Sequence, residues 1–301
     1  MNIRMENNMM LFIYNPYAGK AQIKGYLSDI IDMFVKAGYE VIAHPTQENG
    51  DGIRAARDRK KECKVIVCSG GDGTLDEVVT GMMQQGVKVP IGYIPAGSTN
   101  DFGNSLKIPK NMIKAAELIV NGNKKSFDIG SFNDDTFVYI AAFGIFTDVS
   151  YETKQSAKNV LGHIAYLLEG VKRLSSLKSF FMKITCEGEV IEDEFIFGMV
   201  TNSLSVGGFK SITGKNVTLD DGLFEVTMIK KPKNPIELNS IVAALMIEEM
   251  DTKYMYTFKA KELTIESQMQ VAWTLDGEYG GEHSKVEIRN INKAIEIFTP
   301  E

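Results

Sequence analysis

The first half of the chain alternates apolar runs with stretches in which apolar residues recur every three or four positions. The apolar runs predict strands at 9–14, 39–43, 64–68 and 90–95. Helical spacing lies between them, at Leu27, Ile30, Ile31 and Phe34, in the polar segment 51–62, and at Leu75, Val78, Val79 and Met82. This alternation predicts right-handed βαβ units and a mainly parallel sheet, whose ligands bind beyond the carboxyl ends of the strands.

The second half of the chain is a succession of β-type runs. They lie at 137–145, 180–186, 195–201, 224–229, 254–265, 271–275 and 286–288. Most follow one another without an intervening helix, which is typical of an antiparallel sandwich. Two helices interrupt them, one near 157–174 and one that carries Leu238, Ile241, Val242 and Leu245.

A change in composition near 127–133 predicts two domains. We expect an α/β nucleotide-binding domain at 1–130 and an antiparallel β-sandwich at 131–290. The last strand, about 291–301, can return to the first domain.

Composition narrows the class of protein. The chain has 301 residues, 44% hydrophobic and 24% charged, which is typical of a globular protein and excludes a disordered one. No run approaches the roughly 18–20 apolar residues of a membrane span. The formal net charge of −6 disfavours nucleic acid as a partner, because phosphate contacts need clustered Lys and Arg. Three cysteines and three histidines, all scattered, predict neither a disulfide framework nor a zinc site, and a reducing cytoplasm is expected.

Three loops at predicted strand ends carry candidate chemistry. Gly70-Gly71-Asp72-Gly73-Thr74 lies between a strand and a helix, where glycines let the backbone approach phosphate and free N–H groups attract anions. An ordinary glycine-rich turn is the alternative. The loop 15–20 follows the first strand and can hold further phosphate oxygens, although it lacks P-loop spacing. The loop 97–102 adds hydroxyls and a carboxylate, and its alternative role is the capping of a helix by Ser98 or Thr99.

The strings NPYAGK, GGDGT and PAGSTNDF, in this order, resemble the diacylglycerol kinase catalytic-domain family, especially its soluble bacterial lipid kinases. The resemblance covers nearly the whole chain. The segment 218–223 is similar to the family's structural magnesium loop, and 275–278 is similar to its catalytic turn. From the residues alone, a β-hairpin turn is the favoured interpretation of either segment, because Asp-Gly between apolar residues is the signal for one; only the resemblance favours the magnesium loop and the catalytic turn. The resemblance implies a three-layer α/β first domain like that of NAD kinases and diacylglycerol kinases.

The resemblance also implies roles for individual residues. Those that would line the ATP site are Asn15, Pro16, Tyr17, Ala18, Gly19, Thr46, Gly70, Gly71, Asp72, Gly73, Thr74, Leu75, Asp76 and Ser98. The family usually has Thr at the position of Ser98, and the hydroxyl is kept. It often has Asn at the position of Asp76, so this chain adds a negative charge near the nucleotide.

For metal binding and catalysis, the resemblance implies that Asp221 binds Mg²⁺ through its carboxylate. Thr218 and Leu223 would contribute backbone carbonyls, for which side-chain identity is immaterial. Glu278 would be the general base that takes the proton from the lipid hydroxyl. Its acidic neighbours would be Asp72, Asp101 and Asp276.

These expectations describe an ATP- and Mg²⁺-dependent lipid kinase of phospholipid biosynthesis. It would transfer the γ-phosphate of ATP to diacylglycerol, giving phosphatidic acid, or to a related lipid alcohol, in the cleft between the two domains. One alternative is an NAD kinase-like enzyme, which shares GGDGT, although such an enzyme would be expected to have Asn-Glu where this chain has Asn100-Asp101. Another is a nucleotide or lipid sensor without turnover.

A lipid substrate implies peripheral contact with an anionic membrane surface by a cytoplasmic protein. Basic clusters that can serve are Lys107, Lys110 and Lys114; Lys154 and Lys158; Lys172, Arg173, Lys178 and Lys183; and Lys230, Lys231 and Lys233. The apolar segment 160–168 resembles an interfacial helix, with a core-packed helix as its alternative. An exposed strand edge such as that of 254–265 can pair with a second copy of the chain, so a homodimer is a further alternative.

Overall fold

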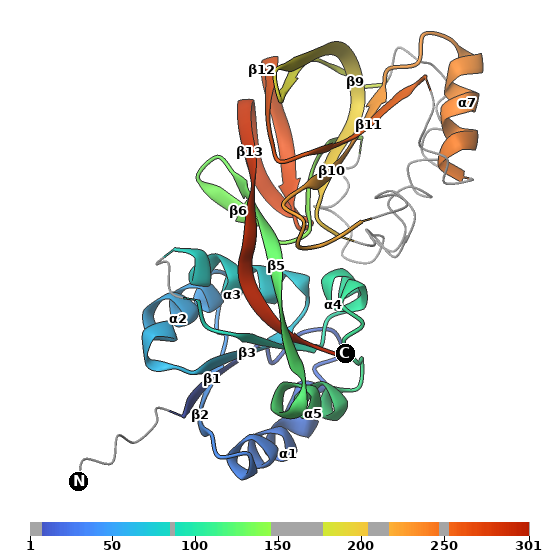
Figure 1. Ribbon diagram of the computed structural model, residues 1–301. Helices are drawn as coiled ribbons and strands as arrows, with labels where there is room; N and C mark the ends of the chain where they lie inside the picture. The colour runs from blue at the N-terminus through green and yellow to red at the C-terminus, as the bar shows by residue number, and fades with distance from the viewer. Residues whose placement is uncertain (1–7, 85–87, 146–176, 204–216, 247–252, 301) are drawn as a thin grey trace. The chain divides into compact units, whose positions relative to one another are not determined.

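The computed structural model describes residues 8–84, 88–145, 177–203, 217–246 and 253–300 (Figure 1). The chain divides into two compact units. The first comprises Met1–Phe127 and Lys293–Glu301, and the second comprises Asp128–Asn292. Two strands, β5 (Asn123–Phe132) and β13 (Glu278–Thr299), contribute residues to both units.

The first unit is built on a parallel sheet. Its strands are β1 (Met9–Tyr14), β2 (Glu40–Pro45), β3 (Val65–Gly70) and β4 (Ile91–Pro95). They follow the order β2-β1-β3-β4, and the end of β13 pairs in parallel with β4 through Ile297 and Ile91. The chain order β1-β2-β3-β4 therefore differs from the spatial order, as the predicted βαβ crossovers require.

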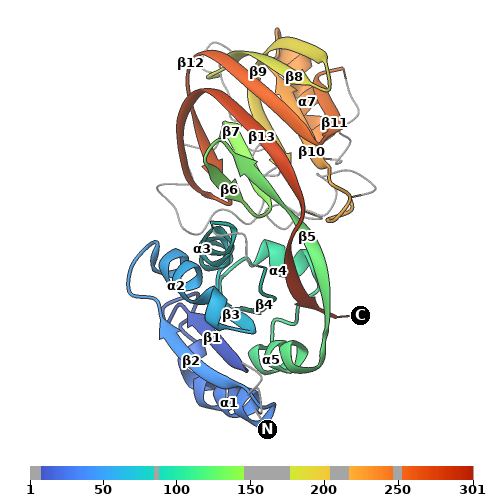
Figure 2. The same ribbon diagram turned by 60° about the vertical axis from the view of Figure 1, so that its left-hand side comes forward.

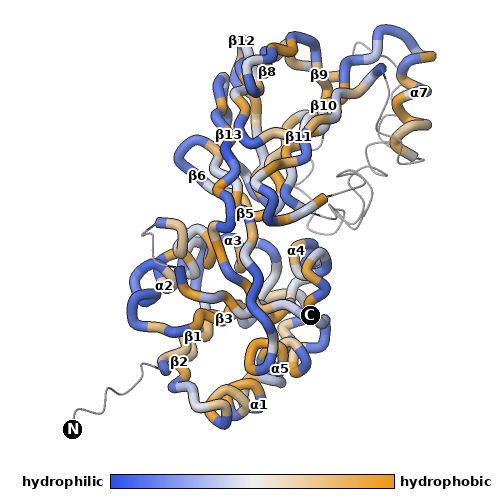
Figure 3. Tube along the Cα trace, viewed as in Figure 1, coloured by the Kyte–Doolittle hydropathy of each residue, from blue (hydrophilic) through white to orange (hydrophobic). Residues whose placement is uncertain are grey.

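Helices cover both faces of this sheet. The longer ones are α1 (Ile23–Lys36), α2 (Asp51–Arg59), α3 (Asp72–Met83) and α5 (Met112–Asn121). Figures 1 and 2 show α1 and α5 together on one side and α2 and α3 together on the other. Two short helices, η1 (Lys60–Glu62) and α4 (Asp101–Ser105), complete the unit. The predicted three-layer α/β fold is confirmed, and Figure 3 shows its apolar strands against the hydrophilic α2.

The second unit is mainly antiparallel, as predicted. Besides β5 and β13 it contains β6 (Asp135–Phe137), β7 (Ile140–Gly144), β8 (Phe180–Cys186), β9 (Glu189–Thr201), β10 (Phe224–Lys230), β11 (Met255–Ala260), β12 (Glu262–Leu275) and the helix α7 (Pro235–Met246). Pairs such as β9–β10, β10–β11 and β12–β13 are antiparallel. Trp273 lies in the core, with its ring centroid 4.9 Å from that of Phe143 and 5.0 Å from that of Phe132.

Several elements predicted from the sequence differ from those in the structure. The segment 254–265, predicted as one strand, is two, because β11 ends at Ala260 and β12 begins at Glu262. Between them Lys261 accepts a hydrogen bond from the Asn290 N–H at 2.8 Å, and no Gly or Pro marks the break. The segment 271–275 is the end of β12 rather than a separate strand. Sequence analysis missed α5 and β5, and the helix predicted near 157–174 lies outside the described residues.

Candidate active site

The GGDGT segment forms the turn from β3 into α3. Gly70 ends the strand, Gly71 has an extended backbone, and the helix begins at Asp72. A Cβ atom added at Gly97 would lie 2.5 Å from the Gly71 Cα, so at this point two loops approach backbone to backbone. A side chain at 97 would separate them. The first N–H groups of α3 lack partners within the helix, and a helix N-terminus of this kind attracts anions.

A network of hydrogen bonds joins this turn to the loop after β4. The Gly70 carbonyl accepts from the N–H groups of Ala96 at 2.8 Å and Gly97 at 3.2 Å. The Tyr93 hydroxyl lies 3.2 Å from both that carbonyl and Asn100 Oδ1. Burial raises the pKa of Tyr93 well above its ordinary value, so the hydroxyl stays protonated as a donor.

Asn100 folds the loop into shape. It lies in the left-handed region with φ of 54°. Its Oδ1 accepts from the Gly97 N–H and its Nδ2 donates to the Gly97 carbonyl, both at 2.9 Å. Asparagine tolerates this backbone conformation better than most residues, because its short side chain bonds locally. Asn100 therefore holds Gly97 in place against Gly71.

Asp72 and Asp101, predicted as acidic neighbours, lie together in the first unit. Asp72 Oδ2 accepts from the Asp101 N–H at 3.2 Å, and Oδ1 accepts from the Phe102 N–H at 3.3 Å. The Asp72 carboxylate thus caps α4. The alternative in which Ser98 or Thr99 caps this helix is wrong, because Asn100 occupies the N-cap position. Burial raises the pKa of Asp72, although the backbone N–H donors oppose the shift.

The loop after β1 closes against the same backbone. The Asn15 N–H donates to the Ser69 carbonyl at 2.8 Å, and Asn15 Oδ1 accepts from the Tyr17 N–H at 2.9 Å. Gly19 has φ of +56°, and a Cβ there would lie 2.4 Å from the Ala96 carbonyl oxygen. The loops after β1, β3 and β4 therefore meet at one edge of the sheet.

Thr46 and Glu77 lie beside this edge. The Thr46 N–H donates to the Tyr14 carbonyl at 2.9 Å, which places Thr46 directly after β2. Glu77, which sequence analysis missed, accepts from the N–H groups of Gly50 at 2.7 Å and Gly52 at 2.8 Å. Its carboxylate thus binds the start of α2 and links that helix to α3. The Gly50-Asp51-Gly52 string was the only local hint of such a bond.

In the second unit, the 275–278 segment is a tight hairpin between β12 and β13. Leu275 pairs with Glu278, and the two residues between them have positive φ, 52° at Asp276 and 88° at Gly277. Two such residues in succession form a type I′ turn, so the hairpin interpretation is confirmed. Glu278 is exposed at the start of β13. A hairpin tip and a general base are compatible roles for the same four residues.

The Asp276 carboxylate holds this hairpin in place through backbone hydrogen bonds. It is 5% exposed. Its Oδ2 accepts from the Val138 N–H at 2.5 Å, and its Oδ1 accepts from those of Tyr139 and Ile140, each at 2.9 Å. Three donors to a buried carboxylate make a rigid support. Asp276 therefore ties the turn that presents Glu278 to the segment before β7.

The 218–223 loop is organised by a residue that sequence analysis did not identify. Asp128 is fully buried, and its Oδ2 accepts from the Gly222 N–H at 2.7 Å. Its Oδ1 accepts from Asn292 Nδ2 at 2.9 Å, and its own N–H donates to the Leu219 carbonyl at 2.9 Å. Asn202 Nδ2 donates to the Asp128 carbonyl at 2.7 Å. Asp128 thus gives this loop a defined shape.

The donor chemistry of the loop suits a hard divalent cation. Asp221 offers a carboxylate, and the predicted partners Thr218 and Leu223 offer backbone carbonyls, which are the ligands that Mg²⁺ and Ca²⁺ prefer. Lys259 Nζ lies 3.2 Å from Asp221 Oδ2, so this carboxylate already attracts a positive charge. Within the described residues, no group of three or more His, Cys, Asp or Glu is placed to hold a metal ion. A metal at this loop would therefore depend on backbone oxygens.

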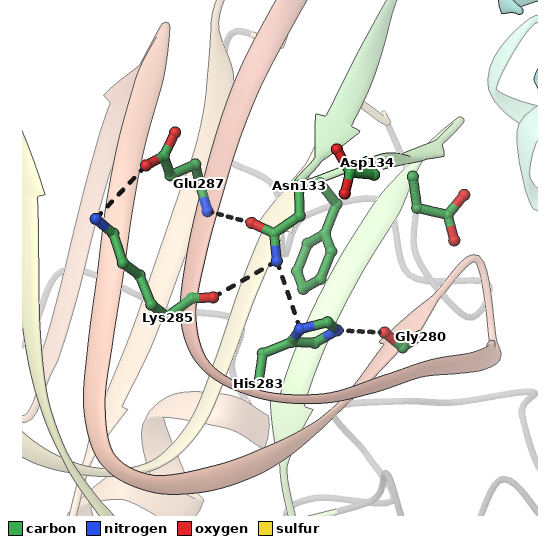
Figure 4. A pocket seen from close by; sticks show the side chains of 8 residues that line it. Asn133, Asp134, Gly280, His283, Lys285 and Glu287 are labelled. Carbon is green, nitrogen blue, oxygen red and sulfur yellow. Dashed lines mark hydrogen bonds and ion pairs between the residues drawn. The ribbon is translucent and has the colours of Figure 1, made fainter.

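A pocket in the second unit lies elsewhere. Figure 4 shows Asn133 between His283 and Glu287, with Asn133 Oδ1 accepting from the Glu287 N–H at 2.9 Å. His283 Nε2 lies 2.9 Å from the Gly280 carbonyl, and Nδ1 lies 3.4 Å from Asn133 Nδ2. A proton on Nε2 lets the ring donate to the Gly280 carbonyl and leaves Nδ1 as the acceptor facing Asn133 Nδ2. The predicted nucleotide and metal residues do not line this pocket, and its hydrogen bonds brace the strand that begins at Glu278.

The predicted membrane clusters differ in their surroundings. Lys107, Lys110 and Lys114 are exposed around the start of α5. In contrast, Lys230 lies 3.5 Å from Asp193 and Lys231 lies 2.9 Å from Glu194. Lys154, Lys158, Lys172, Arg173 and the segment 160–168 lie outside the described residues. No helix within the described part of the chain is long and apolar enough to span a bilayer.

Comparison with known proteins decides the family. The sequence profile of the diacylglycerol kinase catalytic domain matches residues 9–132. The profile of the YegS C-terminal NAD kinase beta sandwich-like domain matches residues 140–299. The chain is 35% identical over 291 residues to a diacylglycerol kinase of Staphylococcus carnosus (strain TM300), covering 96% of this chain and 94% of the relative. The chain belongs to the diacylglycerol kinase family. A Bacillus subtilis (strain 168) diacylglycerol kinase is 33% identical over 290 residues, covering 96% of this chain and 95% of the relative.

Solved structures agree with this assignment. A crystal structure from Bacillus anthracis str. Sterne has a TM-score of 0.82 at 25% identity, and the match covers 97% of each chain. A crystal structure of a diacylglycerol kinase from the same organism has a TM-score of 0.76 at 24% identity, again over 97% of each chain, which shows the shared fold. Membership of the family supports a lipid kinase. It favours this reading over the NAD kinase-like alternative, because the relatives are named diacylglycerol kinases.

Proposed function

We propose that this diacylglycerol kinase family member transfers the γ-phosphate of ATP to the hydroxyl of diacylglycerol, giving phosphatidic acid, or to a related lipid alcohol. The observation that carries the proposal is the approach of the Gly71 and Gly97 backbones beside the first turn of α3. Backbone N–H groups without bulky side chains around them are what a phosphate chain requires. The family and its named relatives support the lipid as acceptor.

In this proposal the first unit binds the nucleotide. The residues that serve it are Asn15, Pro16, Tyr17, Ala18, Gly19, Thr46, Gly70, Gly71, Asp72, Gly73, Thr74, Leu75, Asp76 and Ser98. Phosphoryl transfer needs little covalent chemistry from the protein, so positioning and charge stabilisation dominate. The network through Tyr93 and Asn100 supports this role, since it keeps the loop backbones in fixed positions. Asp72 acts through the same network by holding the start of α4.

Glu278 is the proposed general base. Its carboxylate takes the proton from the lipid hydroxyl, the hydroxyl oxygen forms a bond to the γ-phosphorus, and the bond to the β,γ-bridging oxygen breaks to release ADP. Exposure at a hairpin tip supports this role, because a base must reach its substrate. Asp276 is then a positioning residue, because its carboxylate is already bound by three backbone N–H groups.

Thr218, Asp221 and Leu223 would hold a magnesium ion. A bound Mg²⁺ supplies positive charge that offsets carboxylate and phosphoryl oxygens. Asp128 would keep the loop in shape, because it bonds to Gly222 and Leu219. The exposed group of Lys107, Lys110 and Lys114 is the proposed contact with an anionic membrane surface, because basic side chains near such a surface are attracted to it.

Glu278→Gln tests the assignment of the base. The amide cannot take a proton, so transfer of labelled phosphate should fall by about 10²-fold or more, the usual contribution of general base catalysis. ATP binding should be unchanged, because the nucleotide loops belong to the first unit. Glu282→Gln is the matched control, since Glu282 is an exposed carboxylate on the same strand. Near-normal turnover in Glu278→Gln removes this residue from the role of base.

A further inference from the structure

Three charged side chains form a continuous cluster beside the 218–223 loop. Lys259 Nζ lies 3.2 Å from Asp221 Oδ2 and 3.1 Å from Glu225 Oε1. The cluster therefore joins two acidic side chains to a single lysine. The side chains of Asp221 and Lys259 are 27% and 39% exposed, whereas that of Glu225 is 8% exposed. The lysine therefore connects an accessible carboxylate to a buried one.

Both oxygens of Asp221 are engaged. Oδ1 accepts from the Leu223 N–H at 3.0 Å, a bond that closes the loop upon itself. Oδ2 faces Lys259. Oδ1 already accepts a backbone hydrogen bond, so a cation that leaves the Leu223 bond undisturbed binds most readily through Oδ2, the same oxygen that the ammonium group contacts. Lysine and metal ion therefore meet at one atom.

Glu225 gives Lys259 a second partner that is independent of the loop. The two residues are paired across β10 and β11 in the strand register. A buried carboxylate is costly without a nearby positive charge, so Glu225 keeps Lys259 close even when Asp221 binds a metal ion instead of the lysine. Loss of the Asp221 contact thus leaves neither charge isolated. The lysine can give up Asp221 without leaving the site.

We propose that Lys259 is the built-in cation of the 218–223 loop, and that it competes with the divalent metal ion for Asp221 and so sets how much metal the protein requires. This inference rests on the proposed role of Asp221 as a magnesium ligand. The lysine neutralises the loop when metal is scarce and remains on Glu225 when metal binds. Metal affinity is then a compromise between two cations.

If Lys259 competes with the metal ion, removing its ammonium group should raise the metal affinity; if Lys259 supports the metal site, the same change should lower it. Removing the ammonium relieves its repulsion of the divalent ion and frees Asp221 Oδ2, so Lys259→Met should bind metal more tightly. For charges a few ångströms apart under water-like screening, the gain should be about tenfold in affinity. If Lys259 merely braced Asp221 for the metal, the same substitution would weaken binding.

Direct titration with Mn²⁺ in the absence of ATP, followed by electron paramagnetic resonance of the free ion, measures this affinity without any turnover. Lys259→Met should lower the dissociation constant about tenfold relative to the wild type. Lys259→Arg, which keeps the charge, should remain within about twofold of it. Lys231→Met is the matched control, because Lys231 lies 2.9 Å from Glu194 and its loss changes the net charge equally. Its affinity should match the wild type.

Two further variants keep the outcome decisive. Lys259→Met with Glu225→Gln removes both charges of the strand pair, so it avoids a lone buried carboxylate and should show the same tightening. Asp221→Ala should abolish the Mn²⁺ site. If Asp221→Ala leaves binding unchanged, the proposed metal assignment fails. If it abolishes binding while both Lys259→Met variants bind at wild-type affinity or more weakly, competition by Lys259 is refuted and the metal assignment stands.

Discussion

Asp276→Asn is the substitution that separates support from catalysis at the hairpin. It replaces a buried carboxylate that accepts three backbone hydrogen bonds. Asparagine is at least as suitable as aspartate at the first position of a type I′ turn followed by glycine, so the turn itself is kept. The change therefore isolates the charge and one acceptor atom.

The expected cost follows from the three bonds. The amide oxygen can retain Tyr139 and Ile140, which both donate to Oδ1, while the amide nitrogen then faces the Val138 N–H. A hydrogen bond to a charged group is worth about 1.5–3 kcal/mol, and an unmatched buried donor adds to the loss. We expect the free energy of unfolding of the second unit to fall by about 3 kcal/mol.

Trp273 supplies the assay. It is the single tryptophan of the chain, is 1% exposed and lies in the core of the second unit, so its fluorescence reports that unit. With a urea dependence of about 2 kcal/mol/M, the midpoint should fall by about 1–2 M. Gly277→Ala is the comparison, because a Cβ there meets no atom within 4 Å and its φ of +88° carries only backbone strain. It should cost about 1 kcal/mol.

One result refutes this reasoning. Suppose that the free energy of unfolding of Asp276→Asn lies within about 0.5 kcal/mol of the wild-type value, and that the variant still loses most of its turnover. Asp276 then acts in the chemical step. A shifted midpoint together with weakened turnover places it where the structure does, as the support of Glu278.

Three further predictions concern the nucleotide loops, the buried acid and the membrane. Gly19→Ala should weaken ATP binding about tenfold or more, because its Cβ would press on the Ala96 carbonyl. Gly38→Ala is the control, because Gly38 also has a positive φ but a Cβ there meets no atom within 4 Å. Calorimetric titration with ATP should show weakened binding for Gly19→Ala and unchanged binding for Gly38→Ala. Burial raises the pKa of Glu225 to about 7, from an ordinary value of 4.5, so the folded state keeps a proton that the unfolded chain releases. Stability should then fall by up to about 3 kcal/mol as the pH rises from about 4.5 to 7. Urea midpoints in metal-free buffer should show this slope in the wild type and lose it in Glu225→Gln. Vesicles of anionic lipid should retain the protein at low salt and release it at high salt, and absence of retention would contradict a membrane contact.

The local features of the fold follow from the sequence more readily than the long-range ones. The apolar run at 9–14 coincides with β1, and the GGDGT segment forms the turn into α3 that its glycines predict. The Asp-Gly pair at 276–277 forms the expected hairpin. Each of these signals lies within a few neighbouring residues, so a pattern in the sequence is enough to detect it.

The residues that hold the candidate site together were not predictable in this way. Asp128 bonds to Gly222 across 94 positions in the chain, and Glu77 bonds to Gly50 across 27. The pairing of Lys259 with Glu225 depends on the register of two strands. Even the end of β11 at Ala260 is not marked by a Gly or Pro in the sequence. Only the three-dimensional structure brings such partners together.

The central claim is transfer of the γ-phosphate of ATP to a lipid alcohol. The most direct measurement incubates the protein with γ-labelled ATP, Mg²⁺ and mixed micelles of an anionic phospholipid, offering each lipid alcohol in turn and NAD as a soluble control. Label in phosphatidic acid when diacylglycerol is present is the predicted result, and label in another lipid phosphate would change the acceptor while keeping the reaction. Label only in NADP, or in no product at all, would contradict the proposed function.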